Sequence, residues 1–304
     1  MSTYAPPTPT LSGDKLTVSY LLNNPLLVQR LLRTLVERRL IGGRILTGRV
    51  DMTGTGAAIY ETSEPIDVDR DAEIIDQLAD YPLVTDQGAT TNLAASLKRG
   101  FKALVSDEDV SRNRLDVVNR KLIKMTNRIV TQFDALVLSA VGSAVSQTQA
   151  AAAAWNTSNA DQFLDLLLSG AKIETLDEGY EANTVVAKPE KWARLVATIA
   201  KMFAAAIDPS TLRTGTIFEI AGLTLLKSPR MPSGTDVIVL DNTQLGSIGW
   251  EDLGGNYDGD PSDPLGVESF VKHDDDNDAW KIQMRKVGVP MVQEPGAAVK
   301  VTGV

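Results

Sequence analysis

The chain has 304 residues, one His and no Cys, and its formal net charge is −9. This length supports one large or two ordinary domains, and the lack of Cys excludes disulfides, thiolate nucleophiles and thiolate metal sites. Apolar residues make up 43% and charged residues 23% of the sequence, as in globular proteins. Residues 1–50 nevertheless hold seven basic and only two acidic side chains. This basic segment indicates contact with an acidic surface, either nucleic acid or another copy, and a solvated helix face is the plain alternative.

A basic amphipathic helix is predicted to begin at Pro25 and to end at Gly42-Gly43. Asn24 before a proline is typical of a helix start, and leucines recur at helical spacing after it. The arginines of this segment are candidate contact residues. They are Arg30, Arg33, Arg38, Arg39 and Arg44, with Arg49 a short distance beyond.

Residues 45–92 are predicted to form a long extended loop. Strands are expected at 45–50 and 57–60, on either side of a Gly-rich turn read as a hairpin tip, and acidic sequence with prolines follows. The turn supplies four more candidate contact residues, Thr53, Gly54, Thr55 and Gly56. So long a loop argues against a compact monomer, unless the loop packs on another chain.

The strongest local pattern is a long helix over residues 106–145. Ser106 and the acidic residues after it are typical of a helix N-terminus. From Leu115 to Ala140 apolar side chains follow at steps of three and four, and Asn113 is expected to interrupt the first turn. The pattern predicts a spine longer than a domain of this size usually needs.

An α+β region is predicted beyond residue 150. Helices are expected at 161–168 and 190–206, and strands at 184–187, 217–226, 237–240 and 246–250. Residues 254–264 read as a polar linker. The last strands are expected at 267–271, 279–287 and 298–301.

No catalytic, cofactor or metal motif emerges, so no enzyme activity and no cofactor are predicted. His273 has no nucleophile motif to serve. The alternation of Asp274, Asp276 and Asp278 fails the calcium-loop pattern at its sixth and twelfth positions, which leaves a solvated acidic turn or a weak cation site. The longest apolar stretch, 135–145, is far shorter than the ~20 residues that span a bilayer, and no membrane contact is predicted.

The order of these elements resembles the major capsid proteins of tailed double-stranded DNA phages, whose fold is shared with encapsulin shells. Several short sequence segments carry the resemblance along nearly the whole chain. These are residues 72–82 closing the extended loop, 105–108 and 134–136 in the spine helix, 185–192 and 220–234 in the axial domain, and 285–290 and 294–297 in the last strands. None of them is diagnostic alone.

The resemblance implies an α+β tailed-phage major capsid fold. Its expected parts are an N-terminal arm with the basic helix (1–44), an extended β-hairpin loop (45–92), a peripheral domain with the spine helix (93–150), an axial α+β domain (151–262) and the peripheral return strands (263–304). The implied function is that of a structural subunit. It would self-assemble as pentamers and hexamers into an icosahedral virion shell around phage double-stranded DNA, after synthesis in the bacterial host cytoplasm.

Two other functions stay open. An encapsulin-type nanocompartment shell shares the fold but holds cargo enzymes, and a carboxylate-based hydrolase or ligand-binding protein would depend on the acidic cluster around Asp274. The resemblance also implies partners, namely a separate scaffolding protein, a portal and the packaged DNA. No Lys occurs between Lys15 and Lys98, so we expect no isopeptide crosslink from the extended loop.

Overall fold

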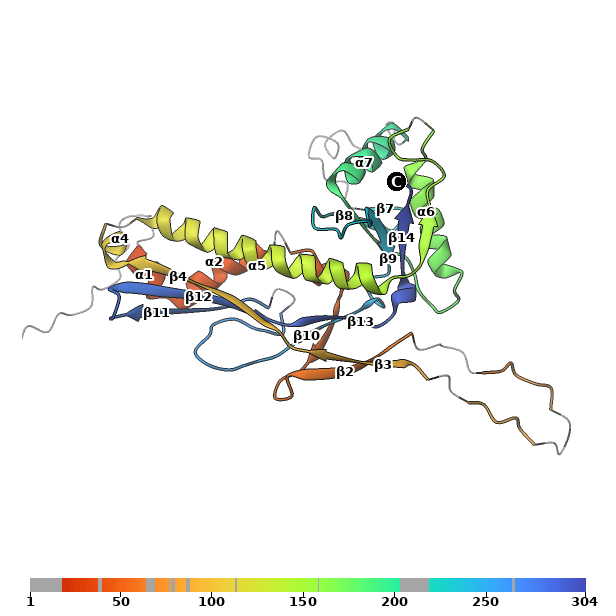
Figure 1. Ribbon diagram of the computed structural model, residues 1–304, viewed down its shortest axis with the longest axis horizontal. Coiled ribbons are helices and arrows are strands. Elements are labelled where there is room, and N and C mark those ends of the chain that lie inside the picture. The colour runs from red at the N-terminus through yellow and green to blue at the C-terminus, as the bar shows by residue number, and fades with distance from the viewer. Residues whose placement is uncertain are drawn as a thin grey trace, which may run out of the picture.

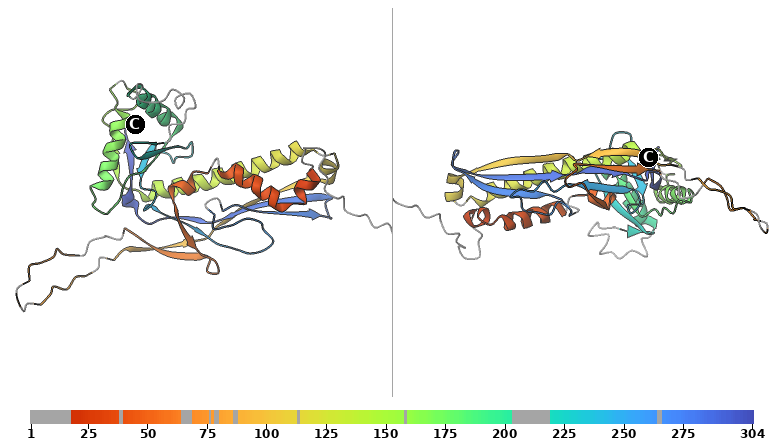
Figure 2. Two further views of the ribbon diagram at one scale, coloured as in Figure 1. Left: turned by 180° about the vertical axis from the view of Figure 1, so that it is seen from behind. Right: turned by 90° about the horizontal axis from the view of Figure 1, so that it is seen from below.

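The computed structural model describes residues 18–37, 40–63, 69–75, 77, 80–85, 88–112, 114–157, 159–202, 219–263 and 266–304. These residues form an elongated body, an upright body at one end of it, and a narrow two-stranded ribbon that projects away from both (Figures 1 and 2). The carboxyl terminus lies in the upright body (Figure 1).

One long helix, α5 (Leu115–Ala144), runs along the elongated body (Figure 1). Its 30 residues span about 45 Å at 1.5 Å per residue, and its apolar stripe is buried from Val118 onward. The short helix α4 (Asp107–Ser111) precedes it, and the Ser106 hydroxyl accepts a hydrogen bond from the Asp109 amide at 3.4 Å. The predicted start at Ser106 and the resumption near Leu115 are both confirmed.

Two N-terminal helices and a three-stranded antiparallel sheet pack around α5. They are α1 (Val18–Leu22), α2 (Pro25–Glu37) and the strands β11 (Glu268–Asp274), β12 (Ala279–Val287) and β4 (Lys98–Ser106), in that strand order. The helix α2 begins at Pro25 as predicted, and its buried Val28 and Leu32 belong to the same core as the α5 stripe. No strand was predicted at β4.

A second sheet extends the elongated body toward the upright one. It contains β1 (Gly48–Asp51), β10 (Gly246–Trp250) and β13 (Val289–Val292); β1 pairs with β10 in parallel and β13 pairs with it in antiparallel orientation. The strand β10 was expected to belong to the axial α+β domain (151–262). It pairs instead with β1, a strand of the N-terminal part of the chain. The pair Gly42-Gly43 was expected to end the basic helix, but it begins another helix, α3 (Gly42–Ile45). The strand that was predicted to start at residue 45 therefore starts three residues later, at Gly48.

The upright body is a six-stranded sheet with two helices. Its strand order is β5 (Thr148–Ala150), β14 (Ala298–Thr302), β9 (Val237–Leu240), β6 (Thr184–Ala187), β8 (Leu223–Lys227) and β7 (Glu219–Ile220), and its helices are α6 (Gln162–Glu174) and α7 (Pro189–Met202). The strand spans predicted for β6 and β9 are confirmed. The last strand, β14, was expected to return to the peripheral body, yet it lies in this sheet between β5 and β9, after the short 3₁₀ turn η1 (Pro295–Ala297). The predicted helix end at 203–206 lies outside the described residues.

The central strands of the upright body are buried on both faces, which explains their unbroken apolar sequence. Val237 and Val239 of β9 belong to the core under α6 and α7, whereas Ile238 and Leu240 of the same strand belong to the core built on α5. Successive side chains of β9 therefore enter two different cores, and this shared strand holds the upright body against the end of the spine helix.

The ribbon consists of β2 (Ala57–Thr62) and β3 (Thr90–Ala95), paired in antiparallel orientation with Ile59 opposite Leu93. Beyond the strands, the chain continues outward to the end of the ribbon, far from both bodies (Figure 1). The predicted extended loop is therefore present. The turn at 53–56 is not its hairpin tip, because β1 and β2, on either side of this turn, lie in different sheets.

Candidate functional site

The ribbon exposes large apolar side chains at its surface. Ile59 and Leu93, partners across the two strands, are 73% and 71% exposed. Four more such side chains lie in the outer part of the ribbon: Ile74, Tyr81, Leu83 and Val84. Large exposed apolar side chains gathered on one projecting segment indicate a site of interaction with another molecule.

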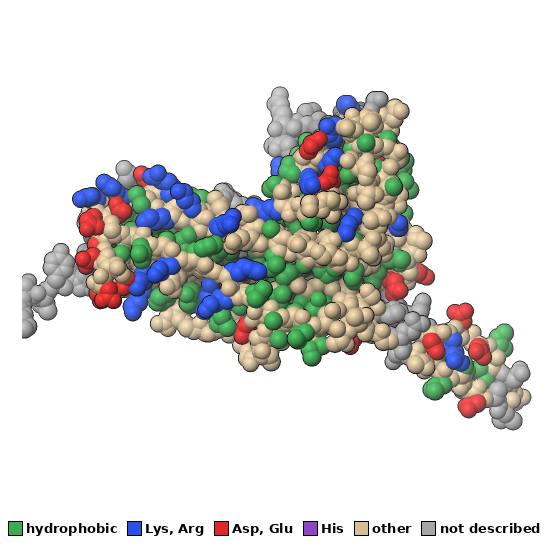
Figure 3. Space-filling view, viewed as in Figure 1, with side chains coloured by type: hydrophobic (Ala, Val, Ile, Leu, Met, Phe, Trp, Pro, Cys, Tyr) green, Lys and Arg blue, Asp and Glu red, His purple; other side chains and the backbone are tan. Residues whose placement is uncertain are grey.

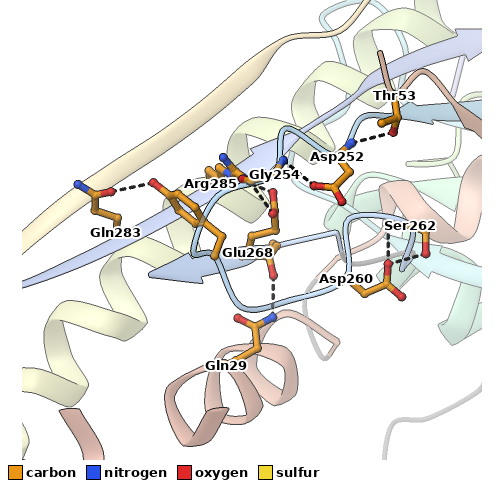
Figure 4. A network of polar contacts seen from close by, with 11 residues as sticks. Gln29, Thr53, Asp252, Gly254, Asp260, Ser262, Glu268, Gln283 and Arg285 are labelled. Carbon is orange, nitrogen blue, oxygen red and sulfur yellow. Dashed lines mark hydrogen bonds and ion pairs between the residues drawn. The ribbon is translucent and has the colours of Figure 1, made fainter. Parts of the chain in front are cut away.

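The turn at 53–56 is fixed at the base of the ribbon. The Thr53 amide donates to the Asp51 carboxylate at 2.8 Å, and the Thr53 hydroxyl accepts a hydrogen bond from the Asp252 amide at 3.0 Å (Figure 4). Gly54 and Gly56 have φ values of 85° and 64°, in the left-handed region that favours glycine. The candidate residues of this turn thus redirect the chain from one sheet into the ribbon.

A buried ion pair organises the neighbouring stretch of polar sequence at 254–263. Arg285 of β12 donates to both carboxylate oxygens of Glu268 at 2.8 Å and to the Gly254 carbonyl at 2.8 Å (Figure 4). Its guanidinium also lies 3.8 Å from the centre of the Tyr257 ring. On the far side, the Gln29 amide of α2 donates to the Val267 carbonyl at 2.7 Å. The segment predicted as a polar linker is therefore tied to the sheet.

The candidate arginines fall into different environments. Arg30 on α2 and Arg44 on α3 are exposed. Arg49 instead donates to the carbonyls of Leu46 and Gly48 at 2.9 and 2.7 Å, and burial lowers its pKa. The side chain of Arg33, and both Arg38 and Arg39, lie outside the described residues.

Asp134, on α5, joins three parts of the molecule and was not predicted as a functional residue. Its side chain is fully buried, and one carboxylate oxygen accepts hydrogen bonds from the amides of Ile41 and Gly42 at 3.0 and 2.8 Å. The other accepts a hydrogen bond from Arg230, of the upright body, at 2.7 Å. Burial raises the pKa of Asp134, and these hydrogen bonds oppose the rise. An acidic residue at a buried position of the spine helix was the available signal.

Basic side chains gather on the elongated body, whereas the ribbon is acidic (Figure 3). Arg120, Lys124 and Arg128 lie on the exposed side of α5. On the sheet, Lys98 and Lys102 line a depression of about 310 Å³ together with Phe101, Tyr257, Gln283, Met284 and Arg285. The described part of the ribbon carries Arg70 against Glu61, Asp69, Asp71, Glu73 and Asp80.

The His and Asp side chains considered for chemistry are engaged within the fold. The His273 ring contacts Asp107 at 2.9 Å and Asp275 at 2.6 Å, and hydrogen bonds to these two carboxylates raise its pKa. Asp274 accepts hydrogen bonds from Asn277 and Lys281 at 2.6 and 2.7 Å. In the described ranges, no three His, Asp or Glu side chains are grouped closely enough to hold a metal ion.

No helix in the part of the chain that the structure describes has the length and apolar character needed to cross a membrane.

Comparison with protein families gives a match over residues 89–301, more than two thirds of the chain, to the family described as phage capsid protein. The chain belongs to this family. The match includes the spine helix, the upright body and the buried Arg285–Glu268 pair of this capsid protein. A search of curated protein sequences finds no match.

Solved capsid structures share the fold of this capsid protein. The capsid of the cyanophage P-SCSP1u is 13% identical, with 86% of this chain and 87% of that one covered and a TM-score of 0.57. The mature capsid of bacteriophage PhiM1 is 11% identical over 87% and 88% of the two chains, with a TM-score of 0.55. A virus-like particle from Pyrococcus furiosus is 10% identical over 90% and 97%, also with a TM-score of 0.55.

These findings confirm the resemblance and the α+β capsid fold expected from the sequence. The capsid protein has a structural role in a shell of many copies.

Proposed function

We propose that this capsid protein assembles as pentamers and hexamers into an icosahedral shell that encloses phage double-stranded DNA. Synthesis in the host cytoplasm, a separate scaffolding protein and a portal at one vertex belong to the same proposal. Family membership and the fold support the shell. Closed assembly from many copies of one chain fits a molecule that leaves large apolar surfaces uncovered.

The ribbon is the observation that carries the proposal. A two-stranded ribbon is marginally stable alone in water, and this one exposes Ile59 and Leu93 next to each other. Burying two such side chains contributes about 1.5–3 kcal/mol each. A neighbouring copy in the shell is the surface that supplies this burial in every subunit.

The distribution of charge indicates where the ribbon docks on a neighbouring copy. The acidic ribbon complements the basic exposed side of α5 and the lysines of β4, Lys98 and Lys102. Opposite charges on separate parts of one chain favour the docking of one part on another copy and disfavour like-charged contacts. We therefore place the ribbon of one subunit across the elongated body of the next.

The basic helix has two candidate binding partners in this shell: DNA on the inner surface, or an adjacent subunit. Arg30 and Arg44 are exposed and can serve either. Residues 30–49, with Arg33, Arg38, Arg39 and Arg49, remain the proposed contact segment, as do the turn residues 53–56 at the base of the ribbon.

An encapsulin-type compartment is the second candidate, favoured by the likeness to the Pyrococcus furiosus virus-like particle. The two candidates differ in their contents, because a genome-bearing shell holds DNA and a compartment holds protein cargo. A hydrolase has less support, since Asp274 is already paired with Lys281 and Asn277.

The ribbon contact is tested with a pair of double variants. Ile59→Asn with Leu93→Asn removes the apolar pair, whereas Ile59→Leu with Leu93→Ile keeps the same composition and serves as the matched control. We expect the first variant to remain folded and to lose closed shells in electron microscopy and sedimentation, and the control to keep them. Normal shells from the asparagine variant would contradict the proposal.

A further inference from the structure

The outer side of α6 is a second uncovered apolar surface, remote from the ribbon. Four leucines of this surface, Leu164, Leu167, Leu168 and Leu176, are 40–45% exposed. The first three lie on α6 at spacings of three and four, which places them on one side of the helix. Leu176 follows two residues after the end of α6.

The opposite side of the same helix holds polar groups, all of them buried. Asp165 accepts a hydrogen bond from the Trp155 indole at 2.9 Å, and Gln162 accepts one from Thr198 of α7 at 2.6 Å. The Ser169 hydroxyl donates to the Asp165 carbonyl at 2.7 Å. Rotating α6 to bury its leucines would break the hydrogen bonds to Trp155 and Thr198, which lie outside the helix. The outward direction of the leucines is therefore fixed by the fold.

The C-terminal end of the leucine side borders one edge of the sheet. Leu168 and Leu176 line a depression of about 450 Å³ together with Gln147 and Gln149, next to the edge strand β5. The other edge of the six-stranded sheet is β7, beside β8 and α7. The upright body thus presents α6 and β5 on one flank and α7, β8 and β7 on the opposite flank (Figure 1).

The two flanks carry complementary charges. Around the end of α6, residues 172–181 hold Glu174, Asp177, Glu178 and Glu181 against Lys172. On α7 and β8, the charged residues are Lys191, Arg194, Lys201 and Lys227 against Glu190. An acidic flank with leucines and a basic flank on opposite sides of one body suit a head-to-tail contact, and such contacts form a ring when the rotation from copy to copy closes.

We infer that the α6 leucine side of one copy packs against the α7–β8 flank of the next copy, around the axis of the pentamer or hexamer. The occupant of this surface is a second copy of the chain. The inference rests on the proposed shell function and adds the specific faces by which subunits meet in the ring.

Substitution provides the first test. Leu164→Asp with Leu168→Asp puts two carboxylates into the contact, and we expect the yield of rings and shells to fall about tenfold or more while the chain stays folded. Leu253→Asp is the matched control, because Leu253 is 42% exposed and lies elsewhere; its yield should stay near that of the unsubstituted chain. Equal yields from all three proteins would overturn the inference.

Crosslinking tests the head-to-tail geometry directly, since the chain has no Cys of its own. In assembled shells of the double variant Leu168→Cys with Lys227→Cys, a short bis-maleimide should give a denaturing-gel ladder ending at five or six subunits. Each single variant should stay monomeric on the gel. Dimers from Leu168→Cys alone would mean that two α6 helices face each other, and normal shells without crosslinks would also overturn the inference. If even the unsubstituted chain forms no shell, the proposed function fails and this inference fails with it.

Discussion

The guanidinium of Arg230 donates a hydrogen bond to the fully buried carboxylate of Asp134 at 2.7 Å, across 96 residues of sequence. Arg230 belongs to the upright body and Asp134 to the spine helix. The same carboxylate also accepts hydrogen bonds from the backbone amides of Ile41 and Gly42 in the N-terminal arm. One charged side chain thus links the three parts whose relative positions determine how a subunit fits into a shell.

Replacing Arg230 by Met should be strongly destabilising. The substitution removes the cation and leaves the buried Asp134 carboxylate without its charged partner, a change that costs roughly 3–5 kcal/mol in the free energy of unfolding. Arg194→Met is the control, because Arg194 pairs with Glu190 at the surface, with side chains 39% and 69% exposed, and such pairs contribute at most about 1 kcal/mol. Chemical denaturation of both variants checks the difference. A similar small effect for both would contradict the role given to Asp134.

Stability should fall as pH rises through the titration of His273. Hydrogen bonds to Asp107, and next to Asp275, raise the pKa of His273 in the folded chain above its ordinary value of 6.5. The stability that protonated His273 contributes is therefore complete below pH 6.5 and is lost as pH rises through the raised pKa. Thermal unfolding of His273→Gln should lack this part of the pH dependence. An identical pH profile for the variant and the unsubstituted chain would refute the assignment.

Charge reversal on the basic helix should reduce assembly and genome retention together. The variant Arg30→Glu, Arg33→Glu, Arg38→Glu turns a segment that binds an acidic surface into one that repels it. The triple Lys variant keeps the charge and should retain most of the yield. The measurements are the particle yield and the DNA content per particle, and unchanged values for the Glu variant would show that this helix contacts neither DNA nor an acidic neighbour.

Mature particles should dissociate completely in hot detergent. The extended loop has no Lys between Lys15 and Lys98, so it lacks the amine required for an isopeptide bond to a neighbour. Boiled samples should give a single band at the mass of one chain on a denaturing gel. A ladder of covalent multimers would show that another residue supplies the crosslink.

The elements that the sequence predicts well are those whose pattern is local. The spine helix follows from apolar residues repeated between Val118 and Phe133, and β6 and β9 follow from short unbroken apolar runs. The strand β4 was missed because Arg99 lies on its more buried side and Leu104 on its exposed side, which breaks the apolar–polar alternation. Local pattern also favoured a break at Gly42-Gly43, where contact of Gly42 with Asp134 instead supports a short helix.

Pairing between distant segments is what the sequence could not supply. The parallel contact of β1 with β10 joins Gly48 to Ser247, and β14 enters the sheet beside β9. Neither pairing leaves a local signal, so the turn at 53–56 resembled a hairpin tip and the last strand seemed to belong with its sequence neighbours. The same reason hid Asp134, whose partners lie 92–96 residues away.

The central claim is that copies of this chain close into a shell. Electron microscopy with mass measurement on the chain, expressed alone and with its neighbouring genes, tests it most directly. The account predicts closed polyhedral particles, or rings of five and six subunits, with DNA inside particles from infected cells. A folded chain that remains a monomer or dimer in every one of these preparations would contradict it.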